Sequence, residues 1–427
     1  ECRKWYGNRT DVVNWEANGA EMKALATKLN HGGHWSRYII NPDRFFTDSI
    51  GWSAISTSRI SARYIGYGFA FSSAAMEAFE YDLKYLLALI NSAVASDILK
   101  LLAPTINFGV EQVGKIPVKI QKKNQIERIT DENIETSKSD WDSFETSWDF
   151  TVHPLVRCKS FSPEEVAEDA KHNIVDMNYV KEAVKRWSNE CYLRFQKLKE
   201  NEEELNRIFI DIYGLQDELT PEVEDKDVTV RRADLTREIK SLLSYAVGCL
   251  FGRYSLDAEG LVYAGGEWDA SKYVTLQPVK DNVLPLCDEE YFGDNDLVNR
   301  IVEFVRVVYG ADTLEENLAF IAKALGCRHH RPCLQQLPQP AAAHLRTADR
   351  AGKQCHFQQQ RCPHDSPCTE ASGQAEAAAR GVRKVRKKHC PPCGAAHCAG
   401  SGRWRKGELC QGADCRRWQE SERAGAN

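Results

Sequence analysis

Serine and arginine side chains recur along one stretch of the first hundred residues, in a pattern suited to binding an anionic polymer. Over residues 50–71, β-branched, aromatic and small residues alternate with Ser53, Arg59 and Arg63. Guanidinium and ammonium groups neutralise phosphates, and hydroxyl groups donate hydrogen bonds to phosphates or base edges. For any one of these residues an ordinary solvated sheet face is the alternative. The full set of candidate nucleic-acid contacts adds one aromatic residue for stacking and several lysines: Lys4, Trp52, Ser53, Arg59, Arg63, Lys115, Lys119 and Lys122.

Patterns for other chemistries are missing from the sequence. It contains no P-loop, HExxH motif, nucleophile elbow or plausible catalytic triad, so we predict no catalytic residue. His153 precedes a proline and has no nucleophile beside it, which favours a structural role. A zinc site is a weak alternative, since one CxxC motif followed by irregularly spaced cysteines is a poor metal signature. Its ligands would be Cys390, Cys393, Cys398 and Cys410.

The composition changes sharply near Cys327. The whole chain of 427 residues has a net charge of −5. Residues 328–427 hold 18 Lys and Arg against 8 Asp and Glu, a charge of +10, which leaves 38 against 53, or −15, for residues 1–327. Nine of the 15 cysteines also lie in this last stretch. We expect residues 328–427 to be disordered or non-native, as a shifted reading frame would make them; a basic nucleic-acid patch at residues 383–388 is a further alternative.

Hydrophobic spacing predicts the elements that position the candidate residues. Residues 1–75 alternate and carry turn signals, which is typical of strands, whereas from Tyr81 onward leucines recur at helical spacing up to Pro104. Asn91 and Ser92 interrupt that helix with short polar side chains that are unfavourable there. Residues 121–151 are polar and predict a linker. Further helices are predicted at residues 178–213, at residues 234–251 packed antiparallel to them, and as a pair at 294–309 and 313–325, with a hairpin at 252–269.

Several long strings resemble those of one enzyme family. Residues 86–118 follow LLALINS-x-V … L-x-x-L-x-P-T-x-N-F … V-x-x-I-P-V, which resembles the end of the target-recognition domains of restriction–modification enzymes. SWDFTVHPL (147–155), EELNRIFIDIYGLQDELTPEV (203–223) and GCLFGRYSLDAEGLVYAGGEWD (248–269) narrow the resemblance. Together they are similar to the C-terminal half of PglX-like adenine-specific DNA methyltransferases from phage-growth-limitation and BREX defence systems. The resemblance covers roughly residues 1–326.

The resemblance implies S-adenosylmethionine-dependent methylation of adenine N6 at a short asymmetric site in double-stranded DNA. Such an enzyme needs a glycine-rich donor loop and an Asn/Asp-Pro-Pro-aromatic loop for the extruded adenine. Asn41-Pro42-Asp43-Arg44 lacks the second proline and the aromatic residue, and Ala264–Glu267 is a turn without the strand–loop–helix frame. The first methionine is Met22. We therefore expect a fragment that recognises DNA, with S-adenosylmethionine bound in the full-length family and not by this chain.

The implied fold is α+β, with a mixed-sheet target-recognition domain followed by long antiparallel helices and a small α/β region. The predicted segments are a recognition domain at 1–120, a linker at 121–160, a helical spacer at 161–251, an α/β subdomain at 252–327 and the tail at 328–427. One alternative is the specificity region of a type IIG restriction–modification enzyme. Another is a protein–protein adaptor whose helices at 178–251 dock other defence-system subunits. We expect a cytoplasmic location, because the six cysteines of residues 1–327 are widely scattered, and no membrane contact, because no long apolar run is present.

Overall fold

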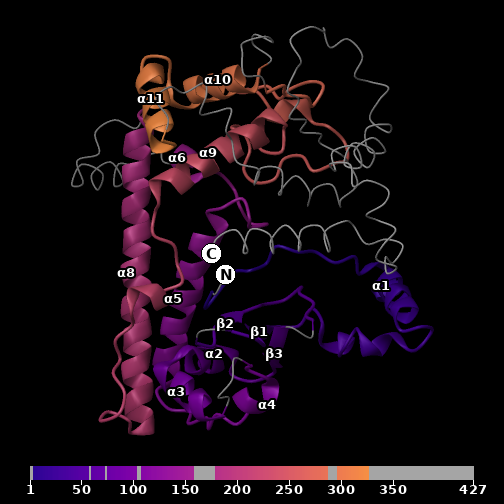
Figure 1. Cartoon of the computed structure of the whole chain (residues 1–427), viewed down its shortest axis with the longest axis vertical. Coiled ribbons are helices and arrows are strands. Elements are labelled where there is room, and N and C mark those ends of the chain that lie inside the picture. The colour runs from indigo at the N-terminus through magenta and orange to yellow at the C-terminus, as the bar shows by residue number, and fades with distance from the viewer. Residues whose placement is uncertain are drawn as a thin grey trace, which may run out of the picture. The chain divides into compact units, whose positions relative to one another are not determined.

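The computed structural model describes residues 3–56, 59–72, 75–102, 107–157, 178–286 and 296–326. All of these lie within one compact unit, Glu1–Arg361. The fold is mixed, with helices around one small antiparallel sheet (Figure 1). The first part of the predicted helical spacer, residues 161–177, and the whole tail from residue 328 lie outside the described residues.

The sheet has three strands in the order β2-β1-β3: β1 is Ser49–Ser53, β2 is Ala62–Tyr64 and β3 is Ala75–Phe79. β1 pairs antiparallel with both neighbours, so the predicted mixed sheet is wrong for these strands. An isolated bridge between Trp5 and Arg63 adds a parallel pairing at one edge. Ile50 and Trp52 are buried on the sheet and supply its apolar side chains. The strand composition of residues 50–71 did predict β1 and β2.

Residues 1–48 contain helices where strands were predicted. α1 covers Glu16–Leu29, and the short 3-10 helices η1 (Trp35–Arg37) and η2 (Pro42–Arg44) follow. Within α1 the backbone of Ala17, Asn18 and Gly19 is left-handed, so the helical period is broken at its start. Because the first turn of α1 is irregular, the apolar residues there do not follow a helical period and resemble the alternation of a strand.

The predicted single helix after Tyr81 is two helices, α2 (Leu83–Asn91) and α3 (Ala93–Leu102), bent by 72°. Ser92 is extended at the break, and its hydroxyl accepts a hydrogen bond from the Ala95 N–H at 3.2 Å. The Asn91 amide pairs with both the N–H and the C=O of Ala62 at 2.9 Å. The two polar residues that are unfavourable inside a helix therefore divide it and attach it to β2. α4 (Val110–Val113) follows.

The segment predicted as a linker contains α5, a helix of 20 residues from Lys123 to Asp142. It packs against both α2 and α8. Apolar residues at Ile126 and Ile129 and a buried row of small polar residues face these neighbours. The polar composition of α5 concealed its helical period, because hydrogen-bonded polar side chains take part of its buried face. α6 (Pro154–Arg157) comes after it.

α8 spans Val180–Tyr213 and is the longest helix in the described residues (Figure 1). It ends as predicted at Gly214, whose left-handed backbone caps the helix. α9 (Leu235–Leu250), α10 (Leu297–Tyr309) and α11 (Leu314–Ala324) also confirm the predicted helices. Figure 1 shows α9 running obliquely to α8 and not alongside it, so the predicted antiparallel pairing is wrong. The connection at 214–234 includes η3 (Asp225–Asp227).

The predicted α/β subdomain contains no strand in its described residues. Residues 252–286 form turns around η4 (Ala270–Lys272), and side-chain oxygens take the place of a strand ladder. The Asp257 carboxylate, for example, accepts from the N–H groups of Val274 and Thr275, both at 2.8 Å. The glycines here mark turns of a loop and not a hairpin.

Two large apolar cores meet along α8. Its first part, including Trp187 and Cys191, packs into a core with α9, α10 and α11. Its second part, including Phe195 and Phe209, packs into a core with β1, α2, α3 and α5. A third, small core joins α1 to residues 35–46 and 70–71. No single helix of the described part is long and apolar enough to cross a membrane; α2 and α3 reach that length and apolarity together, although they are bent.

Candidate nucleic-acid interface

Lys4 lies inside the protein and forms an ion pair with the Glu202 carboxylate of α8. The same carboxylate accepts a hydrogen bond from the Trp5 indole N–H at 2.7 Å. The Lys4 residue is 9% exposed, and its backbone N–H donates to the Thr229 hydroxyl at 3.1 Å. An ammonium held in this way neutralises a buried carboxylate, and its role here is structural.

Trp52 is also interior. It is 3% exposed, and its indole N–H donates to the Phe108 carbonyl at 2.8 Å. A tryptophan in this position stabilises the sheet against residues 107–108 and presents no free face for stacking on a base. Aromatic type alone suggested the stacking role, whereas burial determines which role the side chain has.

Ser53, Arg59 and Arg63 lie near the sheet, and the structure brings two of them together. One Arg63 nitrogen donates to the Ser53 hydroxyl at 3.3 Å and the other to the Arg3 carbonyl at 3.2 Å. Arg59 is 54% exposed and stands 3.8 Å from the Asp227 carboxylate. Arg59 therefore remains accessible to a phosphate, while Arg63 connects β2 to the segment at Arg3.

Lys115, Lys119 and Lys122 are exposed along the segment between α4 and α5. Lys115 pairs with Glu111 at 2.7 Å, and Lys122 pairs with Asp211 at 2.8 Å. The hydrogen bond from Lys122 lowers the pKa of Asp211 below its ordinary value. Lys119 stands 4.9 Å over the Tyr213 ring. Exposed pairs of this kind are weak, so these lysines can exchange a carboxylate for a phosphate.

The candidate zinc ligands Cys390, Cys393, Cys398 and Cys410 lie outside the described residues. In the described part, no group of three or more metal-ligating side chains comes together. Cys191 and Cys249 are buried free thiols whose pKa values burial raises. A raised pKa keeps a thiol protonated and unreactive.

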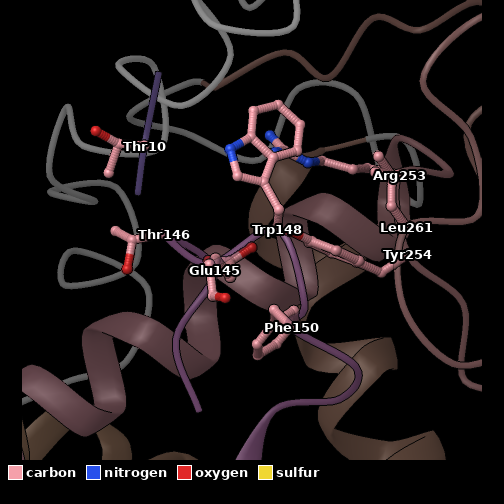
Figure 2. Close-up of a pocket in the computed structure, with 9 residues that line it drawn as sticks. Thr10, Glu145, Thr146, Trp148, Phe150, Arg253, Tyr254 and Leu261 are labelled. Atoms are coloured by element: carbon pink, nitrogen blue, oxygen red, sulfur yellow. The ribbon is translucent and has the colours of Figure 1, made fainter. Parts of the chain in front are cut away.

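A small pocket of about 70 Å³ opens between the end of α5 and the loop after α9 (Figure 2). Figure 2 shows Trp148 and Arg253 on one side of it and Thr10 and Thr146 on the other. Burial raises the pKa of the Glu145 carboxyl at its wall, opposed by the nearby Arg253 guanidinium. The strings SWDFTVHPL and GCLFGRYSLDAEGLVYAGGEWD supply most of the lining.

Two curated proteins match this chain over most of its length. An adenine-specific methyltransferase PglX of Lacticaseibacillus casei (strain Zhang) is 46% identical over 330 residues, which are 76% of this chain and 26% of that protein. An adenine-specific methyltransferase BrxX of Escherichia coli O9:H4 (strain HS) is 34% identical over 360 residues, 76% of this chain and 27% of that protein. The chain is related to the PglX and BrxX methyltransferases. The matches confirm the resemblance drawn from the sequence strings. No family model matches the chain.

The chain spans about a quarter of the length of these PglX and BrxX relatives. A methyltransferase of this kind uses S-adenosylmethionine, and pockets for ligands of that size are roughly 300–1,000 Å³. The pocket at Trp148 is far smaller, and no glycine-rich loop follows a strand at its wall. Its residues do not fit the methyl donor.

The choice of candidate residues by their type alone did not include two features of the site. Arg3, 0% exposed, donates to the Asp140 carboxylate at 2.7 Å, so the first described residues are bound to α5 as well as to α8. The second is a charge pattern: residues 22–42 and 49–76 contain no Asp or Glu, although the body is acidic. This second signal is visible in the sequence.

Proposed function

We propose that this chain is the DNA-recognition part of a site-specific adenine-N6 DNA methyltransferase of a phage-defence system, with S-adenosylmethionine bound and used by sequence outside it. One observation carries the proposal: the chain matches about a quarter of two adenine-specific methyltransferases and contains neither the donor loop nor the adenine loop of such enzymes. A part of such an enzyme that lacks the loops needed for methyl transfer can still serve in DNA recognition and as a scaffold. Its partner is then double-stranded DNA in the cytoplasm.

The distribution of charge supports DNA as the partner. Residues 49–76 supply β1, β2 and the first two residues of β3, and residues 22–42 supply η1 and the second half of α1. These two ranges contain five Lys and Arg residues and no Asp or Glu, whereas Glu77 follows within β3. A chain that is acidic elsewhere must bind a polyanion through such a local surface, since its overall field repels one. One of these cations, Arg59 between β1 and β2, has a side chain that is 54% exposed.

Equilibrium binding of the full chain to short duplexes tests the proposal. We expect binding that weakens steeply as salt rises from about 50 to 200 mM, because phosphate contacts release counterions. A panel of duplexes should then show tighter binding to those that contain the recognised site. No binding to any duplex at low salt would refute the proposal. Incubation with radiolabelled S-adenosylmethionine and DNA should transfer no methyl group.

A second candidate function is docking of other defence-system subunits. Tyr192 and Leu193, in the middle of α8, are 54% and 55% exposed, an unusual position for two large apolar side chains on a helix. Adjacent exposed apolar residues of this kind mark protein contacts. Replacement of both by serine should leave duplex binding unchanged and should abolish co-purification with the other subunits.

A further inference from the structure

Residues 8–48 form a small module, here called the α1 module, which is attached to the sheet at two points. At its start the Arg9 guanidinium donates to the carbonyls of Tyr64 and Ile65, at 2.7 and 2.6 Å. At its end the Phe46 N–H donates to the Phe69 carbonyl at 2.7 Å. Its own core is small and includes Ala26, Ile39 and Phe45. The two attachments hold the module in place while most of its surface stays open.

The outward face of α1 has the wrong composition for a solvated helix. Leu25 is 56% exposed and Leu29 is 55% exposed, one turn apart on the same face, with Lys28 exposed between them. A surface helix normally turns its leucines to the core and its charged residues to water. Large apolar side chains next to a cation therefore mark a face that a partner covers.

The loop after α1 is fixed by its own hydrogen bonds. The Asn30 amide donates to the His34 carbonyl at 2.9 Å, and the His34 ring is 2.8 Å from the Ser36 hydroxyl. The Asn30 carbonyl also accepts from the Gly33 N–H at 2.9 Å. The loop thus keeps its shape without a partner and presents the exposed Arg37 beside α1.

The cations of this surface lack the carboxylate partners found elsewhere. Residues 22–42 contain Lys23, Lys28 and Arg37 and no acidic residue. Lys23 lies over the Trp15 and Trp35 rings, at 5.4 and 5.0 Å, and belongs to the module itself. That leaves Lys28 and Arg37 on the exposed face. By contrast, exposed lysines on α2 and α3 are paired: Lys84 with Asp131 and Lys100 with Asp97.

We propose that the outward face of α1 and the loop at 30–38 contact the DNA duplex, with α1 in the major groove. Lys28 and Arg37 bind phosphates, and Leu25 and Leu29 contact the methyl groups of thymine bases. The major groove admits an α-helix and presents those methyl groups. The inference rests on the proposed function and adds to it the surface that meets the duplex. The exposed Glu21 lies one turn before Leu25 on α1, and the charge that favours a polyanion over a protein partner is that of residues 22–42, where Lys and Arg occur without Asp or Glu.

The test uses the full 427-residue chain and a short duplex of mixed sequence at low salt, where non-specific binding is measurable. The Lys28→Ala/Arg37→Ala variant should lower the slope of log affinity against log salt by about 2, one for each lost phosphate contact. The matched control is Lys84→Ala/Lys100→Ala, which removes the same charge from exposed, carboxylate-paired lysines and should change the slope by less than half as much.

The outcomes separate this inference from the proposed function. A wild-type chain that binds the duplex, together with equal slopes for the test and control variants, would overturn the inference alone. A wild-type chain that binds no duplex would overturn both. The Leu25→Ser/Leu29→Ser variant gives a second measurement: we expect weaker binding with an unchanged slope, and unchanged affinity would exclude α1 from the groove. Vesicles of phosphatidylcholine and phosphatidylserine should not compete with the duplex for binding to the chain. If the vesicles displaced the duplex from the wild-type chain but not from the Lys28→Ala/Arg37→Ala variant, DNA would be refuted as the occupant of this surface.

Discussion

Glu202 is the residue that binds the start of the described chain to its longest helix. Its carboxylate receives the Lys4 ammonium and the Trp5 indole N–H in the interior. Burial removes water from both charges, and each then depends on the other. Interior charges in this arrangement contribute little net stability, but the loss of one partner is costly.

We therefore expect Lys4→Met to destabilise the protein by about 3–5 kcal/mol, because it leaves the Glu202 carboxylate buried without its cation. The Lys4→Met/Glu202→Leu double variant should recover part of the loss. Removal of the exposed Lys100, 3.0 Å from Asp97, should cost no more than about 1 kcal/mol. Urea denaturation followed by tryptophan fluorescence measures all three. Equal losses for Lys4→Met and Lys100→Met would show that the Lys4 pair is solvated.

His153 gives a pH-dependent stability that can be attributed to one side chain. It is fully buried beside Tyr245, and burial lowers its pKa to about 3 from 6.5. The unfolded chain takes up this proton as the pH falls below 6.5 and the folded chain does not, so the contribution to stability is lost between pH 6.5 and pH 3 at up to about 1.4 kcal/mol per pH unit.

His153→Gln keeps an acceptor for the Leu155 N–H, which donates to the ring at 3.3 Å, and removes the titration. Unfolding free energies of the wild type should fall more steeply from pH 6.5 to pH 4.5 than those of the variant. The difference in slope, and not the absolute stability, is the quantity to compare. Parallel pH profiles would mean that His153 is protonated in the folded protein, contrary to its burial.

α8 is the element that joins the two large cores. Trp187 and Phe195 are eight residues apart on it and belong to different cores. No loop separates these cores along α8, so an intact helix must transmit any unfolding of one core to the other. A kink between them should uncouple the two.

Leu193→Pro places that kink at an exposed position where the side chain itself packs little. Proline removes one helical hydrogen bond and clashes with the preceding turn, at a cost of about 3 kcal/mol or more. We expect denaturation in two transitions and a new site of limited proteolysis near residue 193. Leu193→Ala is the matched control and should unfold as the wild type does. A single transition in the proline variant would show that contacts other than α8 couple the cores.

Helices with a continuous apolar period and the strands β1 and β2 could be predicted from the sequence, whereas α1 and α5 could not. α8, α9, α10 and α11 follow from spacing and caps, since each buries a face of apolar side chains at helical spacing. α5 was missed because Thr130, Asn133 and Ser137 lie on its buried face, and a row of polar residues in a sequence resembles a solvated face. For the candidate site, residue type identified the cations. Residue type does not show which cations are buried. Lys4, for example, is buried against the Glu202 carboxylate, 198 residues away in the sequence.

At the scale of the whole molecule, the sequence has two regions of opposite net charge. Residues 1–327 carry −15 and residues 328–427 carry +10. The relatives match 76% of the chain, and the unmatched 24% is about the size of that basic tail. A cationic segment binds any duplex through counterion release whatever its structure. If the proposed function holds, we therefore expect the affinity for a mixed-sequence duplex to combine a contribution of the tail with that of the α1 module.

Removal of residues 328–427 separates these contributions. The truncated chain should bind a mixed-sequence duplex more weakly and with a shallower salt slope, because ten net positive charges are lost. The decrease of about 2 in slope caused by Lys28→Ala/Arg37→Ala should persist in the truncated chain if the tail and the α1 module bind the duplex independently, since independent contacts act additively. If truncation abolished the difference between wild type and variant, the cations of α1 would act only together with the tail, and a sequence-reading surface on the body would be excluded. Zinc analysis of the intact chain is the companion measurement, because one bound ion per chain would identify the tail as a folded metal module at Cys390, Cys393, Cys398 and Cys410.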